Sequence, residues 1–181
     1  YPWTYQDKVA LIGDASHAVV PFYGQGMNAG FEDVKVLVDL LIAHQFDWEK
    51  TLQDYQRLRK PQADAIAELS YHNFLEMSSD TADEDFLLRK KIEAWFTELH
   101  PDKWIPLYSR VTFSNRPYTE AIEEGARQDK IMDEIMNDPE LRRTDWKSSQ
   151  TEEKILALLH HFEDSRQKSQ EPKIFFSSAL G

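Results

Sequence analysis

The segment Lys8–Gly13, with the sequence KVALIG, restricts the fold of this 181-residue chain more than any other feature. It is short and nearly all apolar and it contains β-branched residues, which is the pattern of a strand buried on both faces of a parallel sheet. No other segment has the pattern of a convincing partner strand, and the chain begins with Tyr1 rather than Met. We therefore expect one strand of a sheet whose other strands belong to a longer protein, of which this chain is a part.

After about residue 28 the pattern is almost entirely helical, because apolar residues recur three or four positions apart. Asn28 is the expected N-cap of the first helix, and Asp80 or Thr81 is that of the third. We expect Pro61 to kink or interrupt the second helix, and residues 101–117 to be irregular or short-stranded. Helices are expected at residues 28–44, 47–77, 84–100, 119–136 and 151–167.

The charge and composition exclude several classes of function. A net charge of −11 and a pI of about 5.0 argue against binding to nucleic acid or to anionic lipid, since both depend on Lys and Arg. The chain has no Cys, no apolar run near the roughly 20 residues that span a bilayer, and no signal-peptide pattern. We expect a soluble, cytoplasmic protein that does not bind a membrane.

Neither a metal site nor a catalytic set of side chains is evident. His160 and His161 are adjacent rather than four residues apart, so they do not form the helical pair that binds zinc. No convincing Ser, His and Asp combination is present. We therefore expect no metal ligands and assign no catalytic residue.

The informative segment runs from Gly13 to Asp33 and reads GDASHAVVPFYGQGMNAGFED. It places Asp14 at the end of the strand, where ligands bind in open α/β sheets. A loop then leads into a helix whose first free amides come from residues 24–28. Glycine lets a ligand approach the backbone closely, and amides at a helix start favour an anion or a developing negative charge. Taken alone, His17 is more often a packed or exposed residue than a catalytic one.

The joined string resembles the second FAD-binding motif of the aromatic-hydroxylase (group A) flavoprotein monooxygenases, GDxxHxxxPxxGxGxN. The positions in register are Gly13, Asp14, His17, Pro21, Gly24, Gly26 and Asn28. The resemblance implies that Asp14 bonds the ribityl hydroxyls of FAD, that Pro21 lies beside the flavin ring, and that amides of the turn face its pyrimidine edge. The implied cofactor-binding residues are Asp14, Pro21, Gly24, Gln25, Gly26, Met27 and Asn28.

Within that family the wording is similar to the members that hydroxylate L-kynurenine. The matching segments, besides PFYGQGMNAGFED, are RLRKPQADAI (57–66), LSYHNFLEM (69–77) and IPLYSRVTFSNRPY (105–118). The resemblance implies that Asn73 and Tyr108 bind the carboxylate of kynurenine and that Met77 lines the pocket. Phe22 and Tyr23 are implied to lie where the substrate ring meets the flavin. Asn73 and Met77 are four residues apart, which places them on one face of a helix.

The resemblance also implies the organisation of the parent protein, an α/β FAD/NAD(P)-binding fold with an added helical domain. This chain is then mainly α with one orphan strand. Residues 1–45 are expected to be the last piece of the FAD-binding domain, and residues 46–138 a helical substrate-side domain. Residues 139–181 are expected to be a linker, an amphipathic helix and a loosely held tail.

The implied reaction uses NADPH to reduce FAD and O₂ to hydroxylate L-kynurenine at position 3. The GxGxxG fingerprint that cradles the FAD pyrophosphate is absent from this chain, so we expect the chain alone to be inactive and to bind FAD weakly or not at all. Two alternatives remain open: a flavin hydroxylase for another aromatic acid, and a stand-alone helical interaction module. The unpaired strand edge also makes a homodimer of this chain an expectation.

Overall fold

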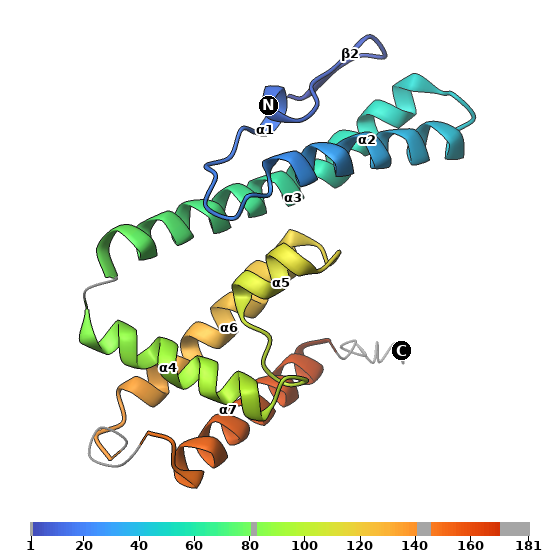
Figure 1. Ribbon diagram of the computed structural model, residues 1–181. Coiled ribbons are helices and arrows are strands. Elements are labelled where there is room, and N and C mark those ends of the chain that lie inside the picture. Colours follow the sequence, from blue (N-terminus) through green and yellow to red (C-terminus); the bar gives the residue numbers. More distant parts are fainter. Residues whose placement is uncertain (1, 81–82, 141–145, 171–181) are drawn as a thin grey trace, which may run out of the picture. The chain divides into compact units, whose positions relative to one another are not determined.

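A computed structural model describes residues 2–80, 83–140 and 146–170 of the chain (Figure 1). Helices dominate these residues, as expected. The chain divides into two compact units, residues 1–126 and residues 127–181, with helix α6 (Tyr118–Met136) running through the boundary.

The N-terminal strands form a short hairpin instead of the single longer strand that the sequence predicted. Strand β1 (Thr4–Tyr5) pairs antiparallel with β2 (Val9–Ala10), with Thr4 opposite Ala10. A polar turn with Gln6 at a φ of 54° reverses the chain between them. The expectation that residues 8–13 have no partner strand in this chain is therefore wrong. Val9 is 50% exposed and Leu11 39%, so neither is buried within these residues.

Helices α2 (Gly26–Ala43) and α3 (Trp48–Leu75) follow each other in the chain and pack side by side (Figure 1). A four-residue helix, α1 (Asp14–His17), precedes them. The N-cap of α2 is Gln25 rather than Asn28, which lies in the first helical turn. The N-cap of α3 is Asp47, at the expected start, and its carboxylate accepts a hydrogen bond from the Lys50 amide at 3.1 Å.

Helix α3 continues past Pro61 without interruption, and a single π-helical turn, η1 (Glu76–Asp80), extends it. Helix α4 (Glu84–Leu99) is capped by Asp83, which accepts from the Phe86 amide, and not by Asp80. Thr81, the other expected cap, lies outside the described residues.

A fifth helix, α5 (Leu107–Phe113), occupies part of the segment that was expected to be irregular or short-stranded. Pro106 stands at its N-cap in an extended conformation, from which a helix can begin. Val111 is buried and Leu107, one turn earlier, is partly buried on the same side. The expectation of irregular structure was wrong here because these two apolar positions were too few to establish a helical period.

Two clusters form the core of the first unit. One joins Tyr23 of the loop and Ala29 of α2 to Ile66 and Leu69 of α3, and to Val111 and Tyr118 from α5 and α6. The other joins Trp3 of the hairpin region to Tyr55 and Ala63 of α3. These clusters hold the loop between α1 and α2 against α3.

The second unit is built from the end of α6 and from α7 (Ser149–Gln170), which includes the expected helix 151–167. Among its described residues, the buried side chains are Gln128, Ile131, Met132, Ile135, Thr151, Ile155 and Leu159. Lys154 of α7 forms an ion pair with Asp138. The expected loose tail lies mostly outside the described residues, but positions 169 and 170 belong to α7.

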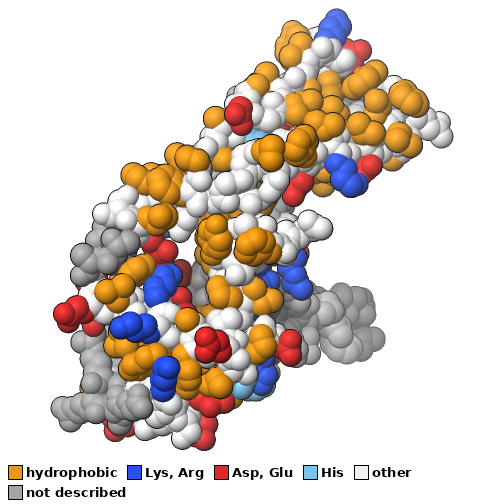
Figure 2. All heavy atoms as spheres, viewed as in Figure 1, with side chains coloured by type: hydrophobic (Ala, Val, Ile, Leu, Met, Phe, Trp, Pro, Cys, Tyr) orange, Lys and Arg blue, Asp and Glu red, His pale blue; other side chains and the backbone are white. Residues whose placement is uncertain are grey.

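Helix α2 presents an exposed apolar stripe, the α2 outer stripe, made of Met27, Phe31, Val34, Val38 and Ile42. Successive members are three or four residues apart, so they lie along one face of the helix. Figure 2 shows apolar side chains gathered on the part of the surface that contains α2. In the unit that contains it, the same helix buries Ala29 and Asp33 and packs Val36, Leu37 and Leu40 against the core.

Candidate functional site

The segment from Gly13 to Asn28, here called the motif segment, begins with a backbone conformation that favours glycine. Gly13 has a φ of 61° and a ψ of −140°, a region that L residues adopt rarely. Asp14 follows at the first position of α1 and is exposed. Its carboxylate makes no hydrogen bond or ion pair with any other residue that the structure describes. The backbone at Gly13 and at the start of α1 therefore sets the position from which the Asp14 side chain extends.

A tight turn follows before α2. The Gly24 amide donates to the Pro21 carbonyl at 3.1 Å, and Gly24 has a φ of 65°. A Cβ atom built on Gly24 would have no heavy atom within 4 Å, so the turn borders open space. A ligand can approach the backbone there without meeting a side chain.

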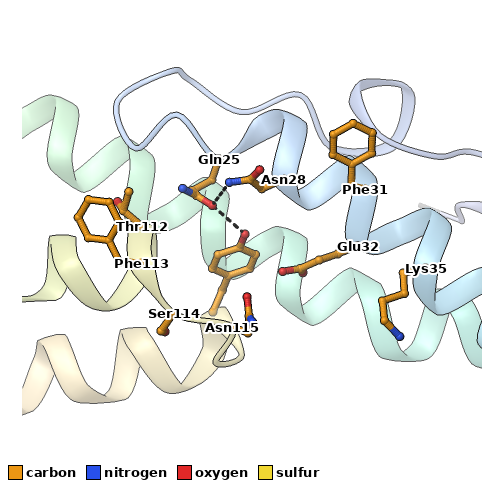
Figure 3. A pocket seen from close by; sticks show the side chains of 10 residues that line it. Gln25, Asn28, Phe31, Glu32, Lys35, Thr112, Phe113, Ser114 and Asn115 are labelled. Carbon is orange, nitrogen blue, oxygen red and sulfur yellow. Dashed lines mark hydrogen bonds between the residues drawn. The ribbon is translucent and has the colours of Figure 1, made fainter.

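The start of α2 offers unpaired backbone amides. The first amides of a helix have no intrahelical partner, and no side chain among the described residues caps α2 at Gln25. The Gln25 side chain points elsewhere, because its Oε1 accepts from Asn28 Nδ2 at 3.0 Å and from the Tyr118 hydroxyl at 3.3 Å (Figure 3). Met27 is 71% exposed. The backbone, rather than the side chains of Gln25 and Asn28, is available at this helix end.

A pocket of about 490 Å³ borders the same helix start (Figure 3). It lies between α2 and the loop that joins α5 to α6. Burial raises the pKa of Tyr118 to about 12, so the phenol stays neutral and donates to Gln25. Its lining residues are Gln25, Asn28, Phe31, Glu32, Lys35, Thr112, Phe113, Ser114, Asn115 and Tyr118.

A buried network of charged side chains lies beneath the motif segment. Asp33 of α2 has no exposed surface. Its Oδ2 accepts from the Gly13 amide at 3.0 Å and lies 2.5 Å from His17 Nε2. Its Oδ1 accepts from Arg59 Nε at 2.7 Å. One carboxylate thus connects the strand end, α1 and α3.

Arg59 uses the rest of its guanidinium on α2. Nη1 donates to Glu32 at 2.9 Å and Nη2 donates to the Ala29 carbonyl at 3.2 Å. On the neighbouring turn of α3, the Tyr55 hydroxyl donates to the Leu11 carbonyl at 3.1 Å. Helix α3 therefore holds both ends of the segment around Gly13.

The network changes the acidities of its members. The hydrogen bond to Asp33 raises the pKa of His17, although burial acts in the opposite direction. Burial also acts to raise the pKa of Asp33, but hydrogen bonds from His17, Arg59 and the Gly13 amide outweigh it and hold that pKa below its ordinary value. Both shifts favour an ionised carboxylate beside a protonated imidazole.

Four of the five predicted substrate residues come together in pairs. The Asn73 amide donates to the Phe22 carbonyl at 2.9 Å. The rings of Tyr23 and Tyr108 stack with their centroids 5.5 Å apart. The loop between α1 and α2 therefore contacts the end of α3 and the start of α5.

The fifth predicted substrate residue, Met77, lies in η1 beyond the end of α3 and is 56% exposed. The α-helical spacing that placed it on one face with Asn73 does not apply, because a π-helical turn bonds residues five apart. Among the described residues, no hydrogen bond or ring contact joins Met77 to the other four. Its place in the substrate pocket stays a prediction.

Sequence reasoning missed the residues that support the motif segment. Asp33 lies inside the quoted string and Arg59 inside the second matching segment, yet neither was given a role. Their opposite charges at apolar-flanked helical positions were the available signal, but 26 residues separate them. His17 is buried and packs 5.5 Å from the Trp3 ring, which agrees with its interpretation as a packed residue.

The described residues fit a flavin better than a metal ion. Among them, no group of three or more His, Cys, Asp or Glu side chains could hold a metal. The open space at Gly24, the uncapped start of α2 and the exposed Asp14 carboxylate suit a ligand that has both hydroxyls and an electron-rich edge. In the part of the chain that the structure describes, no helix has the length and apolarity needed to cross a membrane.

Comparisons with known proteins agree with this fit. Residues 3–70 match the FAD binding domain family. The chain is 60% identical over 159 residues to a protein of Flavobacterium johnsoniae named kynurenine 3-monooxygenase. The aligned region covers 88% of this chain and 35% of that relative. A protein of the same name from Christiangramia forsetii is 59% identical over 159 residues, with the same coverage of each.

The similarity extends to eukaryotes. A Saccharomyces cerevisiae protein named kynurenine 3-monooxygenase is 46% identical over 126 residues, covering 69% of this chain and 27% of that relative. The chain spans about a third of the length of the curated relatives it matches. The chain therefore has a match to the FAD binding domain family over residues 3–70 and is similar over most of its length to proteins named kynurenine 3-monooxygenase.

Proposed function

We propose that this chain forms part of an FAD-dependent monooxygenase that uses NADPH and O₂ to hydroxylate L-kynurenine to 3-hydroxykynurenine. The observation that carries the proposal is the sequence identity of 58–60% over 88% of the chain to three bacterial proteins named kynurenine 3-monooxygenase. The FAD binding domain match over residues 3–70 supports the cofactor. No observation favours either alternative interpretation of the sequence.

In this proposal the motif segment holds the flavin. The Asp14 carboxylate accepts hydrogen bonds from the ribityl hydroxyls, and Pro21 borders the ring. The Gly24 amide is already bonded to the Pro21 carbonyl, so the backbone amides of residues 25–28 are the ones that face the pyrimidine edge, where the positive end of the helix dipole favours negative charge. Bound FAD supplies the redox chemistry and oxygen activation, while the protein orients it and excludes water.

The substrate would lie against the paired residues beside this loop. One N–H of the Asn73 amide is bonded to the Phe22 carbonyl, which fixes the amide and leaves its second N–H to donate to a carboxylate. Tyr108 is 49% exposed, with its ring stacked on Tyr23, so its hydroxyl is accessible to the same anion. Phe22 and Tyr23 then lie between the carboxylate-binding groups and the flavin.

The proposal is tested on the complete gene product that contains this chain. We expect bound FAD after purification, and NADPH oxidation that depends on L-kynurenine with formation of 3-hydroxykynurenine measured by chromatography. Hydroxybenzoates provide the comparison substrates. Faster hydroxylation of a hydroxybenzoate than of kynurenine would move the assignment to another flavin hydroxylase, and the absence of any flavin would favour the non-catalytic helical module.

Replacing Asp14 tests the cofactor assignment directly. Asp14→Ala removes the acceptor for the ribityl hydroxyls, and we expect the dissociation constant for FAD to rise about tenfold or more, as for loss of a charged hydrogen bond. Titration of the apoprotein with FAD, followed by flavin fluorescence, measures this. Asp39→Ala, an exposed carboxylate on α2 that pairs with Lys35, is the matched control and is expected to bind FAD as the unaltered protein does.

A further inference from the structure

The buried network around Asp33 has the geometry of a support for Asp14. We propose that Asp33 and Arg59 are positioning residues, which hold the Gly13–Asp14 backbone in the conformation that presents the Asp14 carboxylate to the cofactor. This inference rests on the proposed FAD site. Neither side chain is placed to touch the cofactor in this proposal. They act through Gly13.

Asp33 fixes the backbone next to Asp14. Its Oδ2 accepts from the Gly13 amide at 3.0 Å, and Asp14 is the next residue. Gly13 has a φ of 61°, and because glycine adopts positive and negative φ values about equally readily, contacts from its surroundings are needed to hold it in this one conformation. A Cβ atom built on Gly30 of α2 would lie 3.7 Å from the Gly13 Cα, so the backbone of Gly13 also lies directly against α2.

The Asp33 carboxylate is itself held in place by its hydrogen-bond donors. Arg59 donates to its Oδ1 at 2.7 Å, to the Ala29 carbonyl at 3.2 Å and to Glu32 at 2.9 Å. His17 contacts the same carboxylate from the end of α1. With three donors on its two oxygens and no exposed surface, the Asp33 carboxylate has little freedom to rotate. A rigid acceptor transmits its position to the Gly13 amide.

The Asp14 carboxylate has no hydrogen bond or ion pair of its own among the described residues. The position from which its side chain extends is set by the backbone at Gly13 and at the start of α1. A shift of that backbone would move the carboxylate with it, and small displacements of a binding group reduce affinity strongly. The network thus couples the packing of α2 on α3 to the flavin-binding carboxylate.

Helix α3 also carries a matched control for this network. Asp54 accepts from Arg57 at 2.9 Å and lies 2.9 Å from His44 Nε2. These three residues are of the same types as His17, Asp33 and Arg59, but Arg57 is exposed and no contact joins them to the motif segment among the described residues. Asp54→Asn therefore makes the same chemical change on the same pair of helices, away from Gly13.

The experiment is a double-mutant cycle on the complete gene product, with the FAD dissociation constant of the apoprotein as readout. We expect Asp33→Asn to raise that constant about tenfold or more, and Asp54→Asn to change it by less than about twofold. If Asp33 acts through Asp14, its substitution has little further effect once Asp14 is Ala. The double variant then binds FAD within about twofold of Asp14→Ala alone.

The opposite results overturn the proposal. Effects of Asp33→Asn and Asp14→Ala that multiply in the double variant would show that Asp33 acts by a separate route, such as general destabilisation. If the FAD dissociation constant is unchanged in Asp33→Asn but raised in Asp14→Ala, the positioning role is rejected and the proposed FAD site stands. An unchanged constant for Asp14→Ala would reject the FAD site itself.

Two milder variants keep the test decisive if Asp33→Asn does not fold. Arg59→Lys keeps the positive charge but loses the fixed fork of donors, and His17→Gln keeps an N–H donor for Asp33. Each is placed in the same cycle with Asp14→Ala. We expect each variant to raise the FAD dissociation constant about threefold or more when Asp14 is present, and to have little further effect when Asp14 is Ala. Equal effects in both backgrounds would reject the positioning role.

Discussion

At the scale of single residues, the chain places its most strongly bonded charges beneath the candidate site rather than in it. Asp33, His17 and Arg59 are buried, and their charges compensate one another through direct hydrogen bonds. Removal of the Asp33 carboxylate takes away the buried counter-charge that His17 and Arg59 share, and breaking a buried ion pair in this way destabilises a protein by about 3–5 kcal/mol. The exposed Asp14, which has no such partner among the described residues, is free to bind a ligand.

The His17–Asp33 pair makes stability depend on pH in a defined direction. The hydrogen bond to Asp33 raises the pKa of folded His17 above 6.5, so its contribution is complete below that pH and is lost as pH rises through the raised pKa. The pKa of Asp33 lies below 3.8 because hydrogen bonds outweigh burial, so its contribution is present above that pH and is lost in acid. Arg59 and Glu32 are the other charged groups of the network.

We therefore expect the stability lost in His17→Gln to be larger at about pH 6 than at about pH 9. Urea unfolding of the unaltered and substituted proteins, at matched salt and a series of pH values, gives the two free energies of unfolding. A difference between them that stays constant across this range would contradict the raised pKa. A difference that does not change with pH would instead indicate that His17 contributes through packing on Trp3.

At the scale of elements, the helix starts follow local side-chain chemistry where a cap is present. Asp47 and Asp83 are the N-caps of α3 and α4, and each side chain accepts a hydrogen bond from a backbone amide of the first turn. The start of α2 differs, since Gln25 supplies no such bond. Capped starts stabilise the fold, whereas the uncapped start leaves amides for the proposed cofactor.

Replacing a cap measures this difference. Asp47→Ala removes the acceptor for the Lys50 amide, and we expect the free energy of unfolding to fall by about 1 kcal/mol. Asp47→Asn, which keeps an oxygen acceptor, is expected to retain most of it. Gln53→Ala, at an exposed position of the same helix, is the control and should change stability by less than about 0.5 kcal/mol. Urea unfolding followed by circular dichroism distinguishes the three.

At the scale of the whole molecule, the 181-residue chain exposes an apolar face that a stable monomer rarely leaves uncovered. The α2 outer stripe spans Met27 to Ile42, and Figure 2 shows apolar side chains gathered in the region of α2. Because its members are three or four residues apart, the face is suited to packing against another helix or a sheet.

We expect the isolated chain to self-associate through this stripe. Sedimentation velocity should show an average mass that increases with concentration, and a double substitution, Phe31→Gln with Val38→Gln, should return it towards the monomer. Phe113→Gln, an exposed phenylalanine outside the stripe, is the control. Self-association that persists in the double variant and is lost with Phe113→Gln would place the contact elsewhere.

The amino-acid sequence was sufficient for the helices with a strong period and for the identity of the motif. The start of α3 at Asp47 and the extent of α6 followed from apolar spacing and capping chemistry, which act over a few residues. The short α5 was missed because its period is too brief, and the strand at residues 8–13 was overestimated because its pairing depends on the turn at Gln6.

Local pattern also identified Asp14 and Gly24–Asn28 as candidates, since their residue types and spacing are contiguous. Only the tertiary structure showed that Asp33 and Arg59 meet and that Gln25 bonds Tyr118 across 93 positions. These relations depend on which faces of α2 and α3 pack together. That packing is decided by the burial of side chains from distant segments at once, and no short stretch of sequence contains it.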